Sequence, residues 1–222
     1  MATKAQCAFC FDIIVSQLEN RNATPLIKFE QAMSKLNLSD SDGSSVSSAG
    51  SVGYSDVVKS DSELYPLFVT WNIVIRGESR LRGCIGTFEP QPLEKGLKNY
   101  AKIAAFDDTR FNPISVRELS SLECGVSLLC DFEDAEGPMD WEWGVHGIRI
   151  SFIANGRRYS ATYLPDVPPE HFRTKEETIE SLVNKAGYHG SAWKSLPITL
   201  RRYKSSKEHL LFAEYLALKK KV

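Results

Sequence analysis

The most informative part of the sequence is Leu67–Gly86, which reads Leu-Phe-Val-Thr-Trp-Asn-Ile-Val-Ile-Arg-Gly-Glu-Ser-Arg-Leu-Arg-Gly-Cys-Ile-Gly. Its first nine residues are rich in β-branched and aromatic side chains, which is typical of a β-strand. Gly77–Arg80 predicts a turn. A second strand then begins at Leu81. We therefore expect two consecutive strands joined by a turn, with the hexapeptide Leu81–Gly86 on the second strand.

Helical patterns lie on both sides of these strands. Residues 4–20 favour a helix whose apolar side chains gather near one face. Pro92 opens a second helix, because proline suits the first helical position and the apolar residues that follow keep helical spacing. Ser115 and Glu118 predict a capping box for a short helix. Thr174 and Glu177 form a capping box for a further helix, which ends at Gly187.

Further strands follow the second helix. Cys124–Phe132 resembles a strand in composition. Ile148–Phe152 alternates apolar and polar side chains, and Tyr159–Leu164 is the return strand of a hairpin. Asn155-Gly156 lies between them and favours the positive φ angles of a tight hairpin turn.

The C-terminal region is ambiguous. Ile198–Tyr203 favours an extended conformation, whereas Leu210–Leu218 fits either a helix or a strand. Hairpins mixed with helices, without a regular βαβ alternation, indicate an α+β fold with an antiparallel or mixed sheet and flanking helices. A chain of 222 residues is long enough for one large domain or for two lobes around a core.

The composition of the chain disfavours some classes of partner and some cellular compartments. Lys and Arg number 27 and Asp and Glu 28, so the net charge of −1 disfavours nucleic acid or an anionic membrane as partner. Five cysteines, an odd number, and an N-terminus without a signal-peptide pattern favour a reduced, intracellular protein of the cytoplasm or nucleus. No run approaches the roughly 20 apolar residues that span a bilayer. Residues 39–62 are rich in Ser, Gly and Asp and predict a flexible insertion.

Seven landmarks in order resemble the AMMECR domain family, in its eukaryotic branch. They are Phe68-Val69-Thr70, Leu81–Gly86, Ala105–Phe111, Val126–Leu129, Gly144–Ile148, Tyr163–Val167 and Lys185–Gly187. The match covers about residues 64–216, and the whole chain 1–222 is interpreted as one unit of this type with an unassigned division into two lobes. The resemblance implies an α+β fold with a larger and a smaller lobe, and an intracellular location with nuclear association. It implies no established activity, and it associates prokaryotic relatives with Memo-like proteins and radical-SAM systems.

The hexapeptide supplies the first group of candidate residues. Cys84 is the candidate nucleophile, and Arg82 lies two positions away, on the same face of a regular strand. A guanidinium there would favour the thiolate. Gly83 and Gly86 let a ligand or another backbone segment approach closely. His146 is a candidate base if the fold brings it near Cys84; the alternative is that Cys84 is a small buried apolar residue.

The second group follows one helix later. Arg110 suits a carboxylate or phosphate ligand, but Asp107 or Asp108 would equally pair with it and fix the loop that continues into Phe111. Two adjacent carboxylates are a weak metal signal, so we predict no metal site and no cofactor.

Three functional hypotheses remain open. The first is an intracellular adaptor or regulatory module that presents a cleft near Leu81–Gly86 to a protein or small ligand. The second is an enzyme or enzyme subunit that uses Cys84 in redox or modification chemistry. The third is a regulator associated with nucleic acid through its arginines, which the neutral charge balance disfavours. Whether the protein is an enzyme is left open by the sequence.

Overall fold

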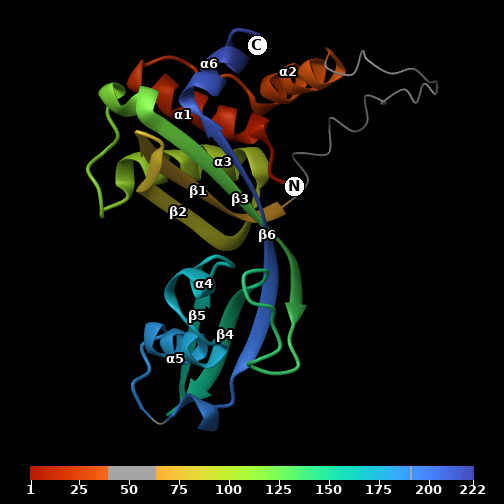
Figure 1. Cartoon of the computed structure of the whole chain (residues 1–222), viewed down its shortest axis with the longest axis vertical. Coiled ribbons are helices and arrows are strands. Elements are labelled where there is room, and N and C mark those ends of the chain that lie inside the picture. Colours follow the sequence, from red (N-terminus) through yellow and green to blue (C-terminus); the bar gives the residue numbers. More distant parts are fainter. Residues whose placement is uncertain (40–63, 191) are drawn as a thin grey trace, which may run out of the picture. The chain divides into compact units, whose positions relative to one another are not determined.

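A computed structural model describes residues 1–39, 64–190 and 192–222 (Figure 1). The predicted insertion at 39–62 therefore lies, apart from Ser39, outside the described residues. The helices are α1 Lys4–Leu18, α2 Leu26–Ser39, α3 Leu93–Lys102, α4 Val167–His171, α5 Lys175–Lys185 and α6 Phe212–Lys219. The strands are β1 Leu64–Ile75, β2 Glu78–Pro92, β3 Leu122–Asp134, β4 Gly147–Ala154, β5 Arg157–Tyr163 and β6 Thr199–Leu211.

Six strands follow the order β2-β1-β3-β6-β4-β5, and the pairs β1/β2, β1/β3, β4/β5 and β4/β6 are antiparallel. The α+β prediction is therefore confirmed. The chain divides into two compact units, which we call unit 1 (residues 1–128 and 206–222) and unit 2 (residues 129–205). Strands β3 and β6 each contribute residues to both units.

Unit 1 is built around the buried face of β1. The alternate residues Leu67, Val69 and Trp71 are inaccessible to solvent. The Phe11 ring of α1 contacts the Trp71 ring edge-on at 5.0 Å between centroids, and Trp71 Nε1 donates to the Ala101 carbonyl of α3 at 3.0 Å. Helices α1 and α3 therefore cover this face of the sheet.

Helix α1 is more buried than its sequence predicts. Residues 5–16 are buried on all sides of the helix, because α2, α3 and α6 all contact it. The predicted apolar face is buried, and burial extends beyond it because the sequence could not show that three other helices would pack against α1. The C-terminal ambiguity is resolved as strand to Leu211 and helix from Phe212.

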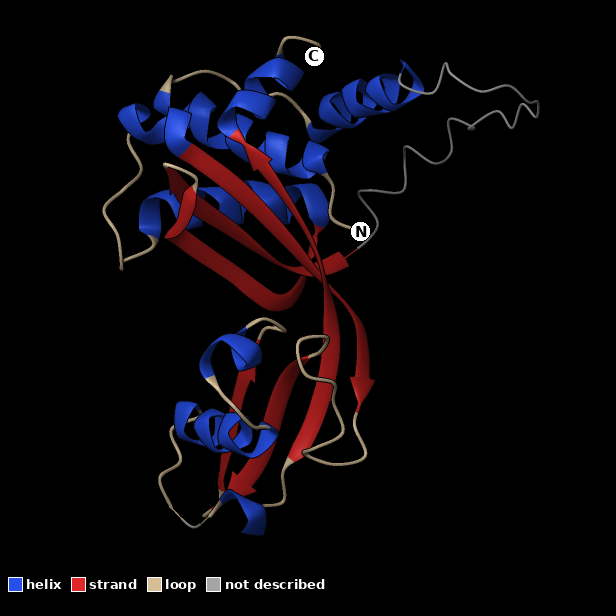
Figure 2. Cartoon of the chain, viewed as in Figure 1, coloured by secondary structure: helices blue, strands red, loops and turns tan. Residues whose placement is uncertain are grey.

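Unit 2 has a core of its own. Ile148, Ile150 and Phe152 of β4 pack with Ile179 and Leu182 of α5. The predicted hairpin is confirmed, with φ of 51° at Asn155 and 72° at Gly156 (Figure 2).

The sequence predicted the N-terminal cap of α5 more accurately than the turn between β1 and β2. The Thr174 side chain caps α5 as predicted, although Glu177 accepts from the backbone of Arg173 rather than from Thr174. The turn placed at Gly77–Arg80 was predicted too late, because the chain reverses at Arg76-Gly77 and β2 begins at Glu78.

Candidate functional site

The two glycines of the hexapeptide pack against the protein itself. A Cβ atom on Gly83 would lie 2.1 Å from the carbonyl oxygen of Ala104. A Cβ atom on Gly86 would lie 2.2 Å from the Phe68 ring and 2.4 Å from the Leu67 carbonyl oxygen. Neither position tolerates a side chain, so these glycines allow close packing within unit 1.

Asp108 and Arg110 together bind the backbone of Cys84, and we call this pair the Asp108–Arg110 clamp. Asp108 Oδ2 accepts the backbone N–H of Cys84 at 2.9 Å, and Arg110 Nη2 donates to the Cys84 carbonyl at 3.0 Å. β2 is the last strand of the sheet, so its outward backbone groups have no strand partner. The clamp supplies that partner at Cys84.

The clamp is held by its own ion pair. Arg110 Nη2 lies 2.7 Å from Asp108 Oδ2, and Nε donates to Oδ1 at 2.9 Å. Asp108 is buried, with 4% of its side chain exposed, whereas 54% of the Arg110 side chain is exposed. The hydrogen bond from Arg110 and the one from the Cys84 amide keep the pKa of Asp108 well below its usual range, against the opposing effect of burial. The carboxylate is therefore ionised throughout the physiological range.

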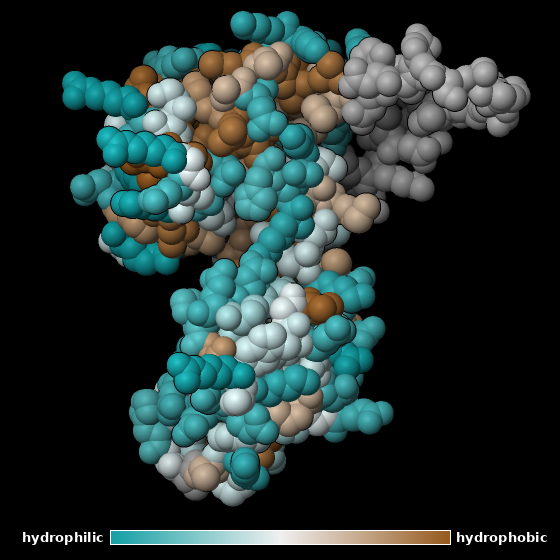
Figure 3. Space-filling view, in the orientation of Figure 1, coloured by the Kyte–Doolittle hydropathy of each residue, from teal (hydrophilic) through white to brown (hydrophobic). Residues whose placement is uncertain are grey.

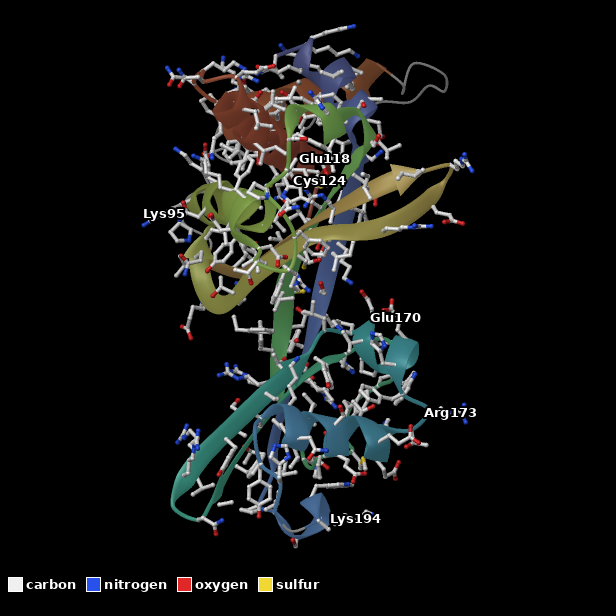
Figure 4. All side chains as sticks on the ribbon, turned by 90° about the vertical axis from the view of Figure 1, so that its left-hand side faces the viewer. Lys95, Glu118, Cys124, Glu170, Arg173 and Lys194 are labelled. Carbon is white, nitrogen blue, oxygen red and sulfur yellow. The ribbon has the colours of Figure 1, made fainter. Side chains whose placement is uncertain are left out.

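Arg82 forms a second ion pair nearby. Its Nε and Nη2 donate to the Glu118 carboxylate at 2.7 and 3.3 Å, and only 13% of its side chain is exposed. Glu118, which is labelled in Figure 4, belongs to the 3-10 helix Val116–Ser121. It is oriented by the predicted capping box, in which the Ser115 backbone N–H and hydroxyl donate to its carboxylate. The hydrogen bonds from Arg82 lower the pKa of Glu118.

Both guanidinium groups also contact one aromatic ring. The Cζ atoms of Arg82 and Arg110 lie 5.9 and 5.5 Å from the centroid of the Phe111 ring. Arg82 and residues 109–112 line an open pocket of about 450 Å³, which we call the unit 1 pocket. Arg110 Nη1 forms no hydrogen bond with any residue in the described part of the chain, so it is available to a ligand in this pocket.

The Cys84 thiol lies on the sheet face opposite α1 and α3. Thr70 is its register partner on β1, and the Thr70 hydroxyl donates to Cys84 Sγ at 3.1 Å. Lys207 of β6 interacts electrostatically with Cys84. Burial lowers the pKa of Lys207, and the interaction with Cys84 raises it. The Cys84 side chain is half-buried.

Two further predicted residues are His146 and Asp107. His146 belongs to unit 2, whereas Cys84 belongs to unit 1. His146 Nδ1 accepts the backbone N–H of Glu142 at 2.9 Å, so one ring nitrogen stabilises a local turn. Asp107 is exposed at the end of a π-helical turn, Ile103–Asp107. Of the two candidate aspartates, Asp108 is the one that pairs with Arg110.

The described residues show neither a metal-type cluster nor a membrane-spanning helix. Within residues 1–39, 64–190 and 192–222, no cluster of three or more His, Cys, Asp or Glu side chains has the arrangement of a metal site. No helix in these ranges is both long enough and apolar enough to cross a bilayer. The five cysteines form no disulfide within the described residues.

The sequence did not identify several partners in this region. Thr70, Asp108 and Glu118 contact residues that lie 14, 24 and 36 positions away along the chain. The capping box at Ser115 was a usable signal for the position of Glu118, but nothing local showed that Arg82 would meet it.

Comparisons with known proteins agree with the fold. The family model described as AMMECR1 matches residues 7–208. An uncharacterised protein of Schizosaccharomyces pombe is 42% identical over 97% of this chain and 96% of its own length. An uncharacterised protein of Arabidopsis thaliana is 41% identical over 97% of this chain and 88% of its own. The crystal structure of an uncharacterised protein from Pyrococcus horikoshii superimposes with a TM-score of 0.56 and 25% identity, covering 82% of this chain and 87% of that one. The chain therefore belongs to the AMMECR1 family.

Proposed function

We propose that this protein is an intracellular regulatory or adaptor module, and that its unit 1 pocket binds a carboxylate-bearing group of a protein or small ligand. The observation that carries the proposal is the set of contacts made by the Arg110 guanidinium. Two of its guanidinium nitrogens are fixed by Asp108 and the Cys84 carbonyl, its face lies against Phe111, and Nη1 remains available. A donor held in place before binding loses little conformational entropy when a ligand arrives.

The charges at the unit 1 pocket favour a single carboxylate. Arg82 and Arg110 are each paired with an acidic side chain, so the pocket carries no large excess of positive charge. A polyphosphate would gain little from such a site, whereas one carboxylate needs only directed donors and an apolar surface. Thr109 and Asn112 add polar groups to the lining.

The cysteine thiols bear on the proposed compartment. Disulfides are common in oxidising compartments and rare in the cytoplasm and nucleus. The five cysteines form no disulfide within the described residues, and three of them are buried. This supports a cytoplasmic or nuclear location.

The test uses the full chain and a peptide array in which each acidic peptide has a counterpart with Glu replaced by Gln. We expect the wild-type protein to be retained on acidic members, and succinate to compete. Arg110→Gln is expected to lose the preference at least about tenfold, because a charge-assisted hydrogen bond is lost. Arg80→Gln is the matched control, because Arg80 lies on β2, does not line the unit 1 pocket and has a side chain that is 70% exposed. Equal retention of the Glu and Gln members by the wild-type protein would exclude the proposal.

Thiol chemistry at Cys84 is a second candidate function. The observation that favours it is the hydrogen bond from Thr70 to Cys84 Sγ, with Lys207 on the same side of the sheet. An oxidised or alkylated Cys84 is the expected product with hydrogen peroxide or iodoacetamide, detectable by mass spectrometry of the intact chain. Cys130, which is also half-buried, is the internal control. If Cys84 reacts no faster than Cys130, this second candidate is lost.

A further inference from the structure

Unit 2 contains an arginine-lined pocket of its own. It encloses about 620 Å³ and lies on the β5-β4-β6 portion of the sheet. Arg149 of β4, Arg158 of β5 and Arg201 of β6 line it, so each of three strands contributes one guanidinium. We call it the unit 2 pocket.

Strand register explains why these side chains converge. Arg149 is paired with Arg201, and Ser151 is paired with both Ser160 and Thr199. Side chains directly opposite one another in a sheet point to the same face. The intervening residues of β4, among them Ile150, face α5 and the core of unit 2, so the arginines and hydroxyls occupy the other face.

The positive charge of this face is poorly compensated. Arg149 and Arg158 form no ion pair with any residue in the described part of the chain, and Arg149 Nε only approaches the Ser160 hydroxyl at 3.4 Å. Arg201 Nε lies 3.7 Å from Asp134 Oδ1, but 91% of the Asp134 side chain is exposed, so this contact adds little. Like charges opposite each other, as Arg149 and Arg201 are, destabilise a sheet unless an anion lies between them.

The floor of the unit 2 pocket is neutral. The Ser151 and Thr199 hydroxyl oxygens lie 2.8 Å apart, and the Thr199 hydroxyl donates to the Ser151 carbonyl at 3.0 Å. The Ser160 hydroxyl donates to the Ile150 carbonyl at 2.9 Å. These hydroxyls are occupied by the protein, so the arginines are the donors that remain for a ligand. The floor brings no negative charge against an anion.

A second hollow of about 300 Å³ continues from the first and shares Ser151, Arg158 and Thr199 with it. Ile153 and Pro197 also line this hollow, and 58% of Ile153 is exposed. An apolar surface beside a cationic pocket suits a molecule with an anionic end and an apolar body. The volumes are in the range of ordinary small-molecule sites, about 300–1,000 Å³.

We propose that the unit 2 pocket binds a phosphorylated small molecule, with the phosphoryl group between Arg149, Arg158 and Arg201 and the organic body toward Ile153. Three guanidiniums match the several oxygens of a phosphoryl group better than the two of a carboxylate. The site is separate from the unit 1 pocket.

A single-stranded nucleic acid fits this face less well. Sequence-tolerant binding of single strands relies on open aromatic rings on which bases stack. Phe132 is covered here by Arg201 on one side, at 5.4 Å, and is stacked with Tyr203 at 5.1 Å. Asp134 and Glu136 also line the unit 2 pocket, and their carboxylates would repel a continuous polyanion. Figure 3 shows hydrophilic side chains covering much of the visible side of unit 2.

The test is isothermal titration calorimetry, which measures the affinity of the full chain for each of five compounds. They are inorganic phosphate, pyrophosphate, phenyl phosphate, glycerol 3-phosphate and a ten-nucleotide oligouridylate. We expect phenyl phosphate to bind about tenfold more tightly than inorganic phosphate, because only the former occupies the apolar hollow. Arg149→Gln and Arg158→Gln are each expected to weaken binding about tenfold. Comparing glycerol 3-phosphate with phenyl phosphate tests whether an apolar body raises the affinity of a phosphate ester.

Arg157→Gln is the matched control for Arg158→Gln. The Arg157→Gln substitution removes one positive charge from the position next to Arg158. The Arg157 guanidinium lies over the Tyr159 ring, 5.4 Å from its centroid, and Arg157 does not line the unit 2 pocket. Its affinity for phenyl phosphate should stay within twofold of wild type. Arg110→Gln should also leave this affinity unchanged, so the two proposals fail separately. An equal loss in Arg157→Gln, tighter binding of the oligouridylate, or no binding of any phosphate compound overturns the proposal.

Discussion

At the scale of single residues, Asp108 has the most consequential position in unit 1. Its carboxylate neutralises Arg110 and accepts the amide of Cys84 on the edge strand. One short side chain therefore fixes both the hexapeptide backbone and the arginine to which we assign ligand binding. Asp107, its neighbour, is exposed.

Asp108→Asn is expected to lower the free energy of unfolding at pH 7 by about 2 kcal/mol, because a buried charge-assisted pair is lost. Asp107→Asn should change it by less than about 0.5 kcal/mol. Urea denaturation measures both. Since the pKa of Asp108 is lowered in the folded state, its stabilisation is complete above the unfolded value of about 4 and is lost as the pH falls through the folded value. A difference between wild type and Asp108→Asn that persists unchanged at pH 2 would contradict this origin.

Gly83→Ala should destabilise the protein by about 3 kcal/mol, because the new methyl group would overlap the Ala104 carbonyl, which is backbone and cannot swing away. Gly137→Ala is the control, since a Cβ atom there meets no atom within 4 Å. Thermal unfolding followed by circular dichroism compares the two. Equal melting temperatures for both variants would show that β2 can shift away from Ala104.

The sequence predicted some of the side-chain contacts in unit 1 and not others. The pairing of Arg110 with an adjacent aspartate was one of the two alternatives that the sequence offered, and it is the one observed. Which aspartate forms the pair depends on burial at the end of the π-helical turn, which has no clear sequence signal. The contact between Arg82 and Glu118 depends on tertiary structure across 36 positions.

At the scale of elements, a buried carboxylate joins the two ends of the chain. Asp12 of α1 is fully buried and accepts from Arg21 Nη2 at 2.9 Å, from the Tyr215 hydroxyl at 2.8 Å and from the Thr24 backbone at 2.6 Å. Lys219 Nζ of α6 lies 2.8 Å from the same carboxylate. Burial alone would raise the pKa of Asp12, but the bonds from Arg21 and Lys219 outweigh it and lower the pKa well below its usual range. Helices α1 and α6 are therefore held together by ionised groups.

Asp12→Asn is expected to cost about 3–5 kcal/mol in the free energy of unfolding, because Arg21 and Lys219 lose a buried partner. Glu19→Gln also removes a partner of Arg21, but 54% of the Glu19 side chain is exposed, so its cost should be below about 1 kcal/mol. Guanidinium denaturation of the two variants gives the comparison. Similar costs would show that Asp12 does not hold these helices together.

Elements with strong local signals were predictable from sequence. The helix from Pro92, the Ser115 cap and the Asn155-Gly156 hairpin each depend on residues within a few positions of one another, and each is observed. Helix α6 was ambiguous because Leu210–Leu218 is apolar without a clear period. It is helical in a setting where Tyr215 and Leu218 are buried in the core of unit 1.

At the scale of the whole molecule, the chain consists of two units, each with a hydrophobic core and each with an arginine-lined pocket of different charge balance. The unit 1 pocket has paired arginines, which favours a carboxylate. The unit 2 pocket has arginines with little compensation, which favours a phosphoryl group. Residues of the unit 1 pocket were among the candidates predicted from sequence. The unit 2 pocket depends on strand register between β4, β5 and β6 and was not predictable from composition.

The most direct test of carboxylate binding at the unit 1 pocket is an amide-resolved NMR titration of the ¹⁵N-labelled full chain with succinate, using the neutral isostere succinamide as control. We predict that succinate shifts the amide signals of residues 82–86 and 108–112, that succinamide does not, and that Arg110→Gln abolishes the shifts while Arg80→Gln retains them. Shifts of equal size with succinamide, or shifts that survive in Arg110→Gln, would contradict the account.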